Sequence, residues 1–253
     1  MRDLLLILSV FLASIVEGVE ALTIVLAMGT TRGWRSTWYG TSAAIVVLAI
    51  FVAVLGPALT LIPINALRLI VGGLLLTFGL QWLRKAILRA SGFKPQHDES
   101  AIYQKTALAS RKVKQSQRKA MIDDWYAFTI SFKGVLLEGL EVAFIVVTFG
   151  AIQGSIPLAA LAALAAVIVV VLAGFKVHRP LSKVPENTLK FVVGIMLTSF
   201  GIFWGSEGAG IRWPGSDAAL LGVIALVVVT SLVLVSWLKR QFSRIEFSKV
   251  SIT

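Results

Sequence analysis

Two pairs of glutamates lie inside strongly apolar stretches of the chain. The stretch SIVEGVEALTIVLA holds Glu17 and Glu20, and the stretch VLLEGLEVAFIVV holds Glu138 and Glu141. Glutamates three positions apart point to the same face of a helix. A charged side chain at the centre of a membrane-spanning helix costs about 2.5 to 3.5 kcal/mol on insertion scales, so a purely structural role explains four of them poorly. Carboxylate oxygens are hard ligands that suit iron, manganese, magnesium or calcium, and the four glutamates are predicted to bind a metal cation.

A structural alternative stays open for these residues. Four buried glutamates can also be protonated and hydrogen-bond the helices together. The glycines inside the two motifs, Gly18 and Gly139, remove a side chain where helices can approach closely. Ordinary packing of small residues explains these two glycines equally well.

Five further polar residues are candidates for secondary roles at the site. Thr23 lies one turn from Glu20. Asn65 and Asn187 each follow a proline by two residues, and capping of the third and sixth helices is the stronger expectation for them. Two acids in the connection before the last span could form an acidic entry for cations, although acids in loops are more often simply solvated. These are Glu207 and Asp217.

The composition shows that these stretches belong to a membrane protein. Of 253 residues, 57% are hydrophobic and 15% are charged, and the mean hydropathy is +0.86. Soluble domains are about one quarter charged. The absence of cysteine excludes disulfides, thiolate metal sites and cysteine nucleophiles. The two histidines, His97 and His178, fall in polar connections.

Seven stretches reach the roughly 20 apolar residues that a helix needs to cross a bilayer. They are residues 4–28, 38–61, 66–88, 126–149, 156–176, 187–205 and 217–238. The first could pass for a signal peptide, but its apolar run continues well beyond a normal signal core and carries the first glutamate pair.

The basic residues fix the expected orientation. Between Arg84 and Lys119 the chain carries ten Lys and Arg against two acids, Asp98 and Glu99, so this connection is expected on the cytoplasmic side. The other connections on that side and the C-terminal tail are also basic, whereas the opposite connections contain a single basic residue, Arg212. The net charge of +11 is therefore an orientation signal with contact to anionic lipid, and nucleic acid is not an expected partner.

The chain contains an internal repeat. EGVEALTIVLAMG aligns with EGLEVAFIVVTFG, which pairs Glu17 with Glu138 and Glu20 with Glu141. After a shift of one residue, a second block aligns with matching Pro, Asn, Leu, Gly, Phe and Trp residues. In that block Pro63, Asn65, Leu67, Gly72, Phe78, Gly79 and Trp82 recur as Pro185, Asn187, Leu189, Gly194, Phe200, Gly201 and Trp204.

Three spans per repeat mean that the second copy enters the membrane from the opposite side. The predicted fold is an all-α polytopic membrane protein with two inverted three-helix repeats and a seventh helix, N-terminus outside and C-terminus inside. Such repeats are typical of secondary transporters, which bind substrate near the midplane. The expected division is repeat 1 at 1–88, a basic cytoplasmic loop at 89–125, repeat 2 at 126–205, and an outer loop, last span and basic tail at 206–253.

At its glutamate motifs and across the 3+3 plan the sequence resembles the oxidase-dependent iron permeases, the high-affinity iron transporters of fungi and bacteria. Those proteins have seven spans and an Arg-Glu-Gly-Leu-Glu motif in the first and fourth. The resemblance implies iron uptake across the cytoplasmic membrane, with Glu17, Glu20, Glu138 and Glu141 as iron ligands. It also implies an extracytoplasmic ferroxidase or peroxidase partner that supplies the ion. It implies no enzymatic activity and no tightly bound cofactor.

The sequence departs from that family at one position of each motif. Val16 and Leu137 stand where the family has arginine, which marks a divergent branch. Without the arginines the four carboxylates carry more net negative charge, which favours a different ion or proton coupling.

Three other functions remain open. A proton-coupled exporter or exchanger of divalent cations such as manganese would use the same glutamates. An intramembrane lipid-pyrophosphate phosphatase shares inverted repeats with glutamate-rich motifs, but this chain has no His or Arg in its motifs to act on a phosphate. A non-transporting scaffold or sensor would act through the basic stretch RKVKQSQRK. The oligomeric state is not evident from the sequence.

Overall fold

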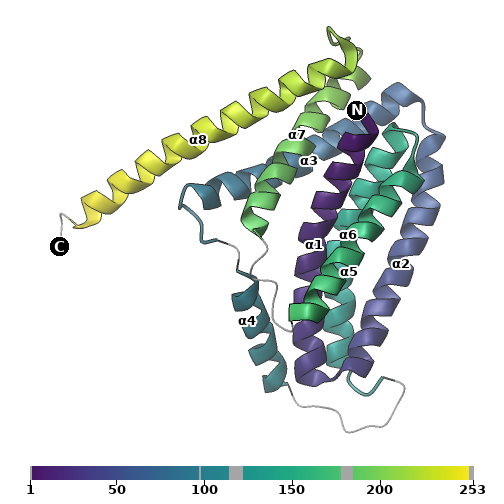
Figure 1. Cartoon of the computed structure of the whole chain (residues 1–253), viewed down its shortest axis with the longest axis vertical. Coiled ribbons are helices and arrows are strands. Elements are labelled where there is room, and N and C mark those ends of the chain that lie inside the picture. Colours follow the sequence, from purple (N-terminus) through teal and green to yellow (C-terminus); the bar gives the residue numbers. More distant parts are fainter. Residues whose placement is uncertain (1, 97, 114–121, 178–184, 251–253) are drawn as a thin grey trace. The chain divides into compact units, whose positions relative to one another are not determined.

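The computed structural model describes residues 2–96, 98–113, 122–177 and 185–250, and their regular structure is entirely helical (Figure 1). The helices are α1 (Arg2–Arg32), α2 (Trp34–Thr60), α3 (Ile64–Ala90), α4 (Glu99–Lys112), α5 (Trp125–Ile152), α6 (Ile156–Val177), α7 (Glu186–Gly208), the short 3₁₀ helix η1 (Ser216–Ala218) and α8 (Ala219–Val250). Both histidines and the basic residues from Lys114 to Lys119 lie outside the described residues.

Seven of these helices are long and apolar enough to cross a membrane, as the sequence predicted. They are α1, α2, α3, α5, α6, α7 and α8, with candidate spans of 19 to 28 residues, against the roughly 20 that a bilayer requires. This is the helix content of a polytopic membrane protein. Several helices extend a few residues beyond the predicted spans, because polar residues such as Arg32 continue the helix past its apolar part.

Helix α4 is an element that the sequence analysis treated as loop. It lies in the basic connection between the third and fourth spans, and its polar composition excludes it as a span. Asp98 caps its N-terminus by accepting hydrogen bonds from the backbone N–H groups of Ser100 and Ala101, at 2.8 and 3.3 Å. Glu99 in the first turn and Lys112 in the last turn have the charges that the helix dipole favours.

The predicted capping by Asn65 and Asn187 is wrong. The N-cap positions of α3 and α7 are occupied by Pro63 and Pro185, and neither helix has a side-chain cap hydrogen bond. The N-cap residue has a non-helical backbone, and the helix starts directly after each proline. Both asparagines therefore lie inside the first helical turn.

The chain forms two compact units. Unit 1 combines Asp3–Leu61 with Asp98–Val184 and contains α1, α2, α4, α5 and α6. Unit 2 combines Ile62–His97 with Pro185–Thr253 and contains α3, α7 and α8. Each unit thus takes helices from both halves of the sequence.

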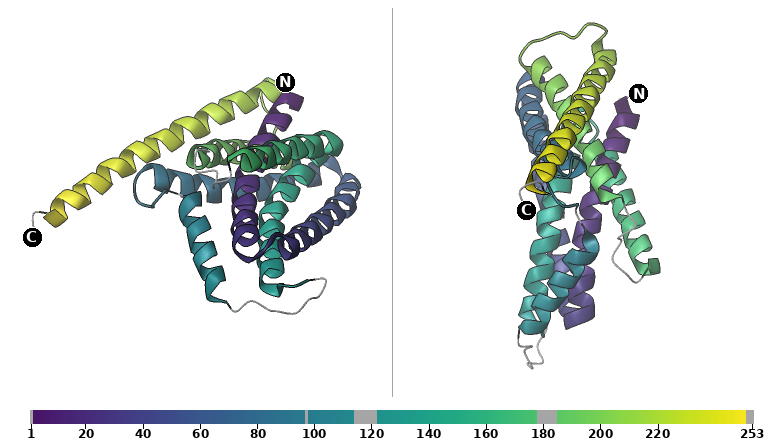
Figure 2. Two further views of the ribbon diagram at one scale, coloured as in Figure 1. Left: turned by 60° about the horizontal axis from the view of Figure 1, so that its bottom comes forward. Right: turned by 90° about the vertical axis from the view of Figure 1, so that its left-hand side faces the viewer.

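In unit 1, α1, α2, α5 and α6 lie side by side as a bundle (Figures 1 and 2). Two glycines mark close helix contacts. A Cβ added to Gly139 of α5 would overlap Leu48 of α2, and one added to Gly18 of α1 would lie 3.5 Å from Val170 of α6. The first and fourth apolar helices are therefore each paired with a neighbour at the glycine of their own motif.

In unit 2, α3 and α7 pack backbone against backbone in an antiparallel arrangement. A Cβ on Gly79 would overlap the backbone nitrogen of Thr198, and a Cβ on Gly201 would overlap that of Leu76. Gly72 and Gly194 likewise meet the backbone of the opposite helix. Helix α8 covers this pair through one apolar cluster of buried residues, formed by Leu83, Ile87, Ile195, Val223 and Val227.

Candidate metal site

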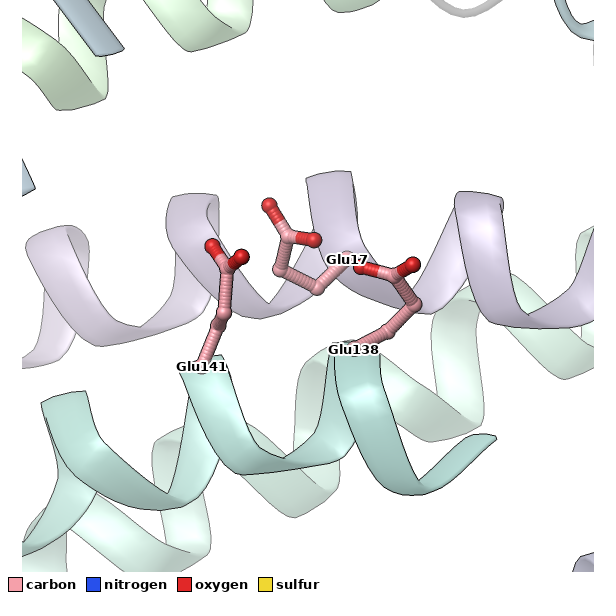
Figure 3. A group of neighbouring side chains, drawn as sticks. All are labelled: Glu17, Glu138 and Glu141. Atoms are coloured by element: carbon pink, nitrogen blue, oxygen red, sulfur yellow. The ribbon is translucent and has the colours of Figure 1, made fainter. Parts of the chain in front are cut away.

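Three of the four predicted glutamates come together in unit 1. Glu17, Glu138 and Glu141 each offer a carboxylate oxygen, and these three oxygens lie within 4.8 Å of one another. Figure 3 shows Glu138 and Glu141 extending from α5 toward α1, with the Glu17 carboxylate between them in that view. Spacing of three residues on α5 places two carboxylates on one helix face, and the third comes from the facing helix.

The three carboxylates lie at the middle of their helices. Glu17 is the middle residue of the 31-residue α1, and Glu138 lies at the midpoint of the 28-residue α5. The side chain of Glu17 is buried, with 2% of the residue exposed, and Glu138 and Glu141 are half-buried. The group is therefore far from either helix end and partly screened from its surroundings.

Electrostatics makes this group a candidate cation site. Two ionised carboxylates about 5 Å apart repel each other by about 3 kcal/mol at an effective dielectric constant of about 20. Three such pairs are present when all three groups are ionised. A bound cation replaces this repulsion with attraction, and three oxygens form a partial coordination shell for a hard ion.

Glu20 is placed differently from its predicted partners. It is half-buried, and the group of three carboxylates does not include it. One of its carboxylate oxygens instead lies within 4.8 Å of one from Glu99, the first residue of α4. Residue spacing does not reveal this neighbour, because Glu99 lies in a basic connection far from Glu20 along the chain.

Thr23, Val16 and Leu137 also lie in unit 1. The buried Thr23 hydroxyl donates to the backbone carbonyl of Val19, at 2.9 Å. Val16 is fully buried, whereas Leu137 is 62% exposed. An arginine would thus meet very different surroundings at these two positions.

The other secondary candidates lie in unit 2. Asn65 is exposed and Asn187 is half-buried, both in first helical turns. Glu207 in the last turn of α7 forms an ion pair with Arg68 of α3, with 3.4 Å between the nitrogen and the oxygen. Asp217 is half-buried in η1. Arg68 compensates the charge of Glu207, which weakens the prediction that these two acids attract cations.

Two buried hydroxyls near the glutamates were missed by the sequence analysis. Ser14 precedes Glu17 by one turn of α1, and Ser131 precedes Glu138 by two turns of α5. They are 1% and 0% exposed, and neither hydroxyl has a hydrogen-bond partner among the described residues. Other hydroxyls of these two helices donate to a carbonyl one turn back, as Thr148 does to Phe144 at 2.7 Å. A serine inside an apolar helix is common, so the sequence alone did not single them out.

No protein-family model, no curated protein and no solved structure matches the chain.

Proposed function

We propose that the chain is a metal-cation permease of the cytoplasmic membrane and that its ion is iron, as the resemblance to the oxidase-dependent iron permeases implies. The observation that carries the proposal is the group of three carboxylates from α1 and α5 at the middle of two apolar helices. Such an acidic group is too costly in a membrane to be kept without a cation or protons. A partner enzyme on the outer side would supply the ion.

In this proposal, the ion crosses the membrane by binding in turn to polar side chains before, within and after the group of three carboxylates. The ion exchanges its water for oxygens of Glu17, Glu138 and Glu141. Glu20 and Glu99, whose carboxylates approach each other, receive it next on the cytoplasmic side. The buried hydroxyls of Ser14 and Ser131 provide oxygen ligands at the two approaches.

The contacts between helices support an inverted repeat. Aligning the two halves pairs Gly79 with Gly201 and Leu76 with Thr198. The contact of Gly79 with Thr198 then corresponds to the contact of Gly201 with Leu76. In unit 1, Gly18 of α1 contacts Val170 of α6 and its counterpart Gly139 of α5 contacts Leu48 of α2, so each motif glycine contacts the second span of the other half.

Exchanged contacts of this kind are what a two-fold axis produces, and they fit a transporter that alternates between two related states. The basic connections support an orientation with the N-terminus outside and the C-terminus inside.

A proton-coupled exchanger of divalent cations is the second candidate. The observation that favours it is the short distance between the three carboxylates. When no metal is bound, protons must relieve the repulsion between these groups. Exchange of protons for metal at one site then couples the two fluxes. Proton movement measured together with metal flux separates the two candidates.

The test is metal flux into proteoliposomes, measured for Fe(II), Fe(III), Mn(II) and Zn(II). Glu17→Gln and Glu141→Gln keep the shape of the side chain and remove its charge. Each is expected to lower flux roughly 10- to 100-fold, as is common when a metal site loses a supporting group. Glu20→Gln is expected to lower flux less, because Glu20 is outside the group of three.

Asp123→Asn is the matched control. Asp123 is an acid in unit 1 that is paired with Arg35 near the helix ends, and its neutral variant is expected to transport at the unmodified rate. Full transport by Glu17→Gln and Glu141→Gln would disprove the proposal. Tight metal binding by the unmodified protein without flux would support a scaffold or sensor instead.

A further inference from the structure

Unit 2 contains an apolar groove between α3, α7 and α8. Its volume is about 460 Å³, within the range of roughly 300 to 1,000 Å³ that is usual for ligand pockets. Its walls include Leu80 and Leu88 of α3 and Leu226, Leu234 and Leu238 of α8. The groove therefore suits a ligand that is largely hydrocarbon.

Contacts of α8 bound the groove at both ends. Toward the start of α8, Val223 and Val227 pack into the apolar cluster with α3 and α7. Toward its end, Phe242 packs edge-to-face on Phe93, which follows α3, with 5.2 Å between ring centroids. Leu83, Ile87 and Val227 of the apolar cluster also line the groove, and leucines of α3 and α8 form the rest of its apolar walls.

Arg84 is the one charged residue among those that line the groove. It is exposed, and among the described parts of the chain it makes no hydrogen bond, ion pair or ring contact. Its guanidinium is always charged and lies on a helix that is apolar enough to span a membrane. A cation in such a place requires an anion that the described residues do not supply.

The end of the groove beyond Arg84 has the features of a membrane interface. Trp237 is 56% exposed and is followed by Lys239 and Arg240. Exposed tryptophans and basic residues gather where a span meets the headgroups. Arg84 is one turn before Leu88, the groove residue of α3 nearest that end, and its long side chain can reach the headgroup level.

We propose that this groove binds one anionic phospholipid, with an acyl chain along the leucines and the phosphate on Arg84. Arginine holds a phosphate through two parallel hydrogen bonds, which explains the position of the charge at an apolar groove. The apolar helix of a second copy would fill the walls equally well but would leave Arg84 without an anion. This inference is independent of metal transport.

The test uses the full chain purified in detergent and supplied with phosphatidylglycerol or phosphatidylcholine of identical acyl chains. Native mass spectrometry counts the lipids retained. Phosphatidylglycerol is expected to be retained in preference to phosphatidylcholine. Arg84→Gln is expected to weaken retention about fivefold, the factor that corresponds to one basic residue near an anionic lipid surface. Lys85→Gln, a change at the exposed neighbour outside the groove, is expected to have no effect.

A second variant tests the apolar part of the groove. Thr230 is exposed and lines the groove, so Thr230→Trp is expected to displace the acyl chain while Arg84 remains. A phosphatidylglycerol with a photoreactive acyl chain is expected to crosslink to α3 and α8 in the unmodified protein and not in Thr230→Trp. Equal retention of the two lipids, or an equal loss in Arg84→Gln and Lys85→Gln, would overturn the proposal. Unchanged crosslinking in Thr230→Trp would also overturn the proposal.

Discussion

Gly79 lies where the backbones of α3 and α7 touch, and it allows a direct test of that packing. A Cβ at this position would overlap the backbone of Thr198, whereas a Cβ on Gly73 would meet nothing within 4 Å. We expect Gly79→Ala to destabilise the protein by about 1 to 3 kcal/mol, because a rigid backbone cannot make room for the methyl group. Thermal unfolding in detergent measures the difference.

Gly73→Ala is the control for that measurement. It lies in the same helix and gains up to about 1 kcal/mol of helix propensity, so its stability is expected to stay the same or rise. Equal losses at both glycines would contradict the close contact between α3 and α7.

Among individual residues, the glutamates of the candidate site could be predicted from the sequence, whereas their grouping in space could not. Glu17, Glu138 and Glu141 stand out in the sequence because charge is rare in apolar segments. That Glu20 approaches Glu99 depends on the rotation of α1 and on the position of α4, neither of which the spacing of residues specifies. The burial of Ser14 and Ser131 depends in the same way on which neighbours cover each helix.

At the scale of elements, α4 is held against α1 by contacts that the sequence did not reveal. Tyr103 hydrogen-bonds to Thr30 of α1, at 2.9 Å, and Ser110 donates to Thr31, at 2.8 Å. Arg32 donates to the backbone carbonyls of Ser110 and Val113, at 3.0 and 2.5 Å. Helix α4 thus lies along the last turns of α1. Periodicity of apolar residues does not detect a helix held mainly by polar contacts.

The buried pair of Arg32 and Asp124 joins the end of α1 to the start of α5 and leads to the second stability prediction. Their side chains are 5% and 4% exposed, with 2.7 Å between Nε and Oδ2. Asp124 also caps α5 by accepting from the N–H groups of Tyr126 and Ala127. Asp124→Ala leaves the arginine buried without its partner and is expected to cost about 3 to 5 kcal/mol. The midpoint of chemical unfolding in detergent reports the loss.

The adjacent acid provides the control. Asp123 pairs with Arg35 at 3.3 Å, but these side chains are 39% and 62% exposed. Water screens such a pair, so Asp123→Ala is expected to cost less than about 1 kcal/mol. If the two alanine variants were equally stable, burial of the Arg32 pair would not matter for folding.

At the scale of the whole molecule, the seven spans were predictable because each is a continuous apolar stretch of sufficient length. The partition into two units was not. Unit 1 contains the first two spans of each half, and unit 2 contains the third span of each half with the last. The sequence relates the halves to each other, but the choice of packing partners depends on side-chain fit between helices, such as the glycine contacts of α3 with α7.

The orientation across the membrane gives the last prediction, and the absence of cysteine from the chain makes it easy to test. Single cysteines at the exposed positions Leu61 and Arg212 are expected to react with a membrane-impermeant maleimide in intact cells. Cysteines at the exposed positions Lys94 and Lys112 are expected to react only after permeabilisation, because basic connections stay in the cytoplasm. The reverse pattern would place Ser131 and Glu20 on the outer side of the carboxylate group and invert the proposed path of the ion. Labelling of Leu61 and Lys94 from the same side would contradict a membrane crossing by α3.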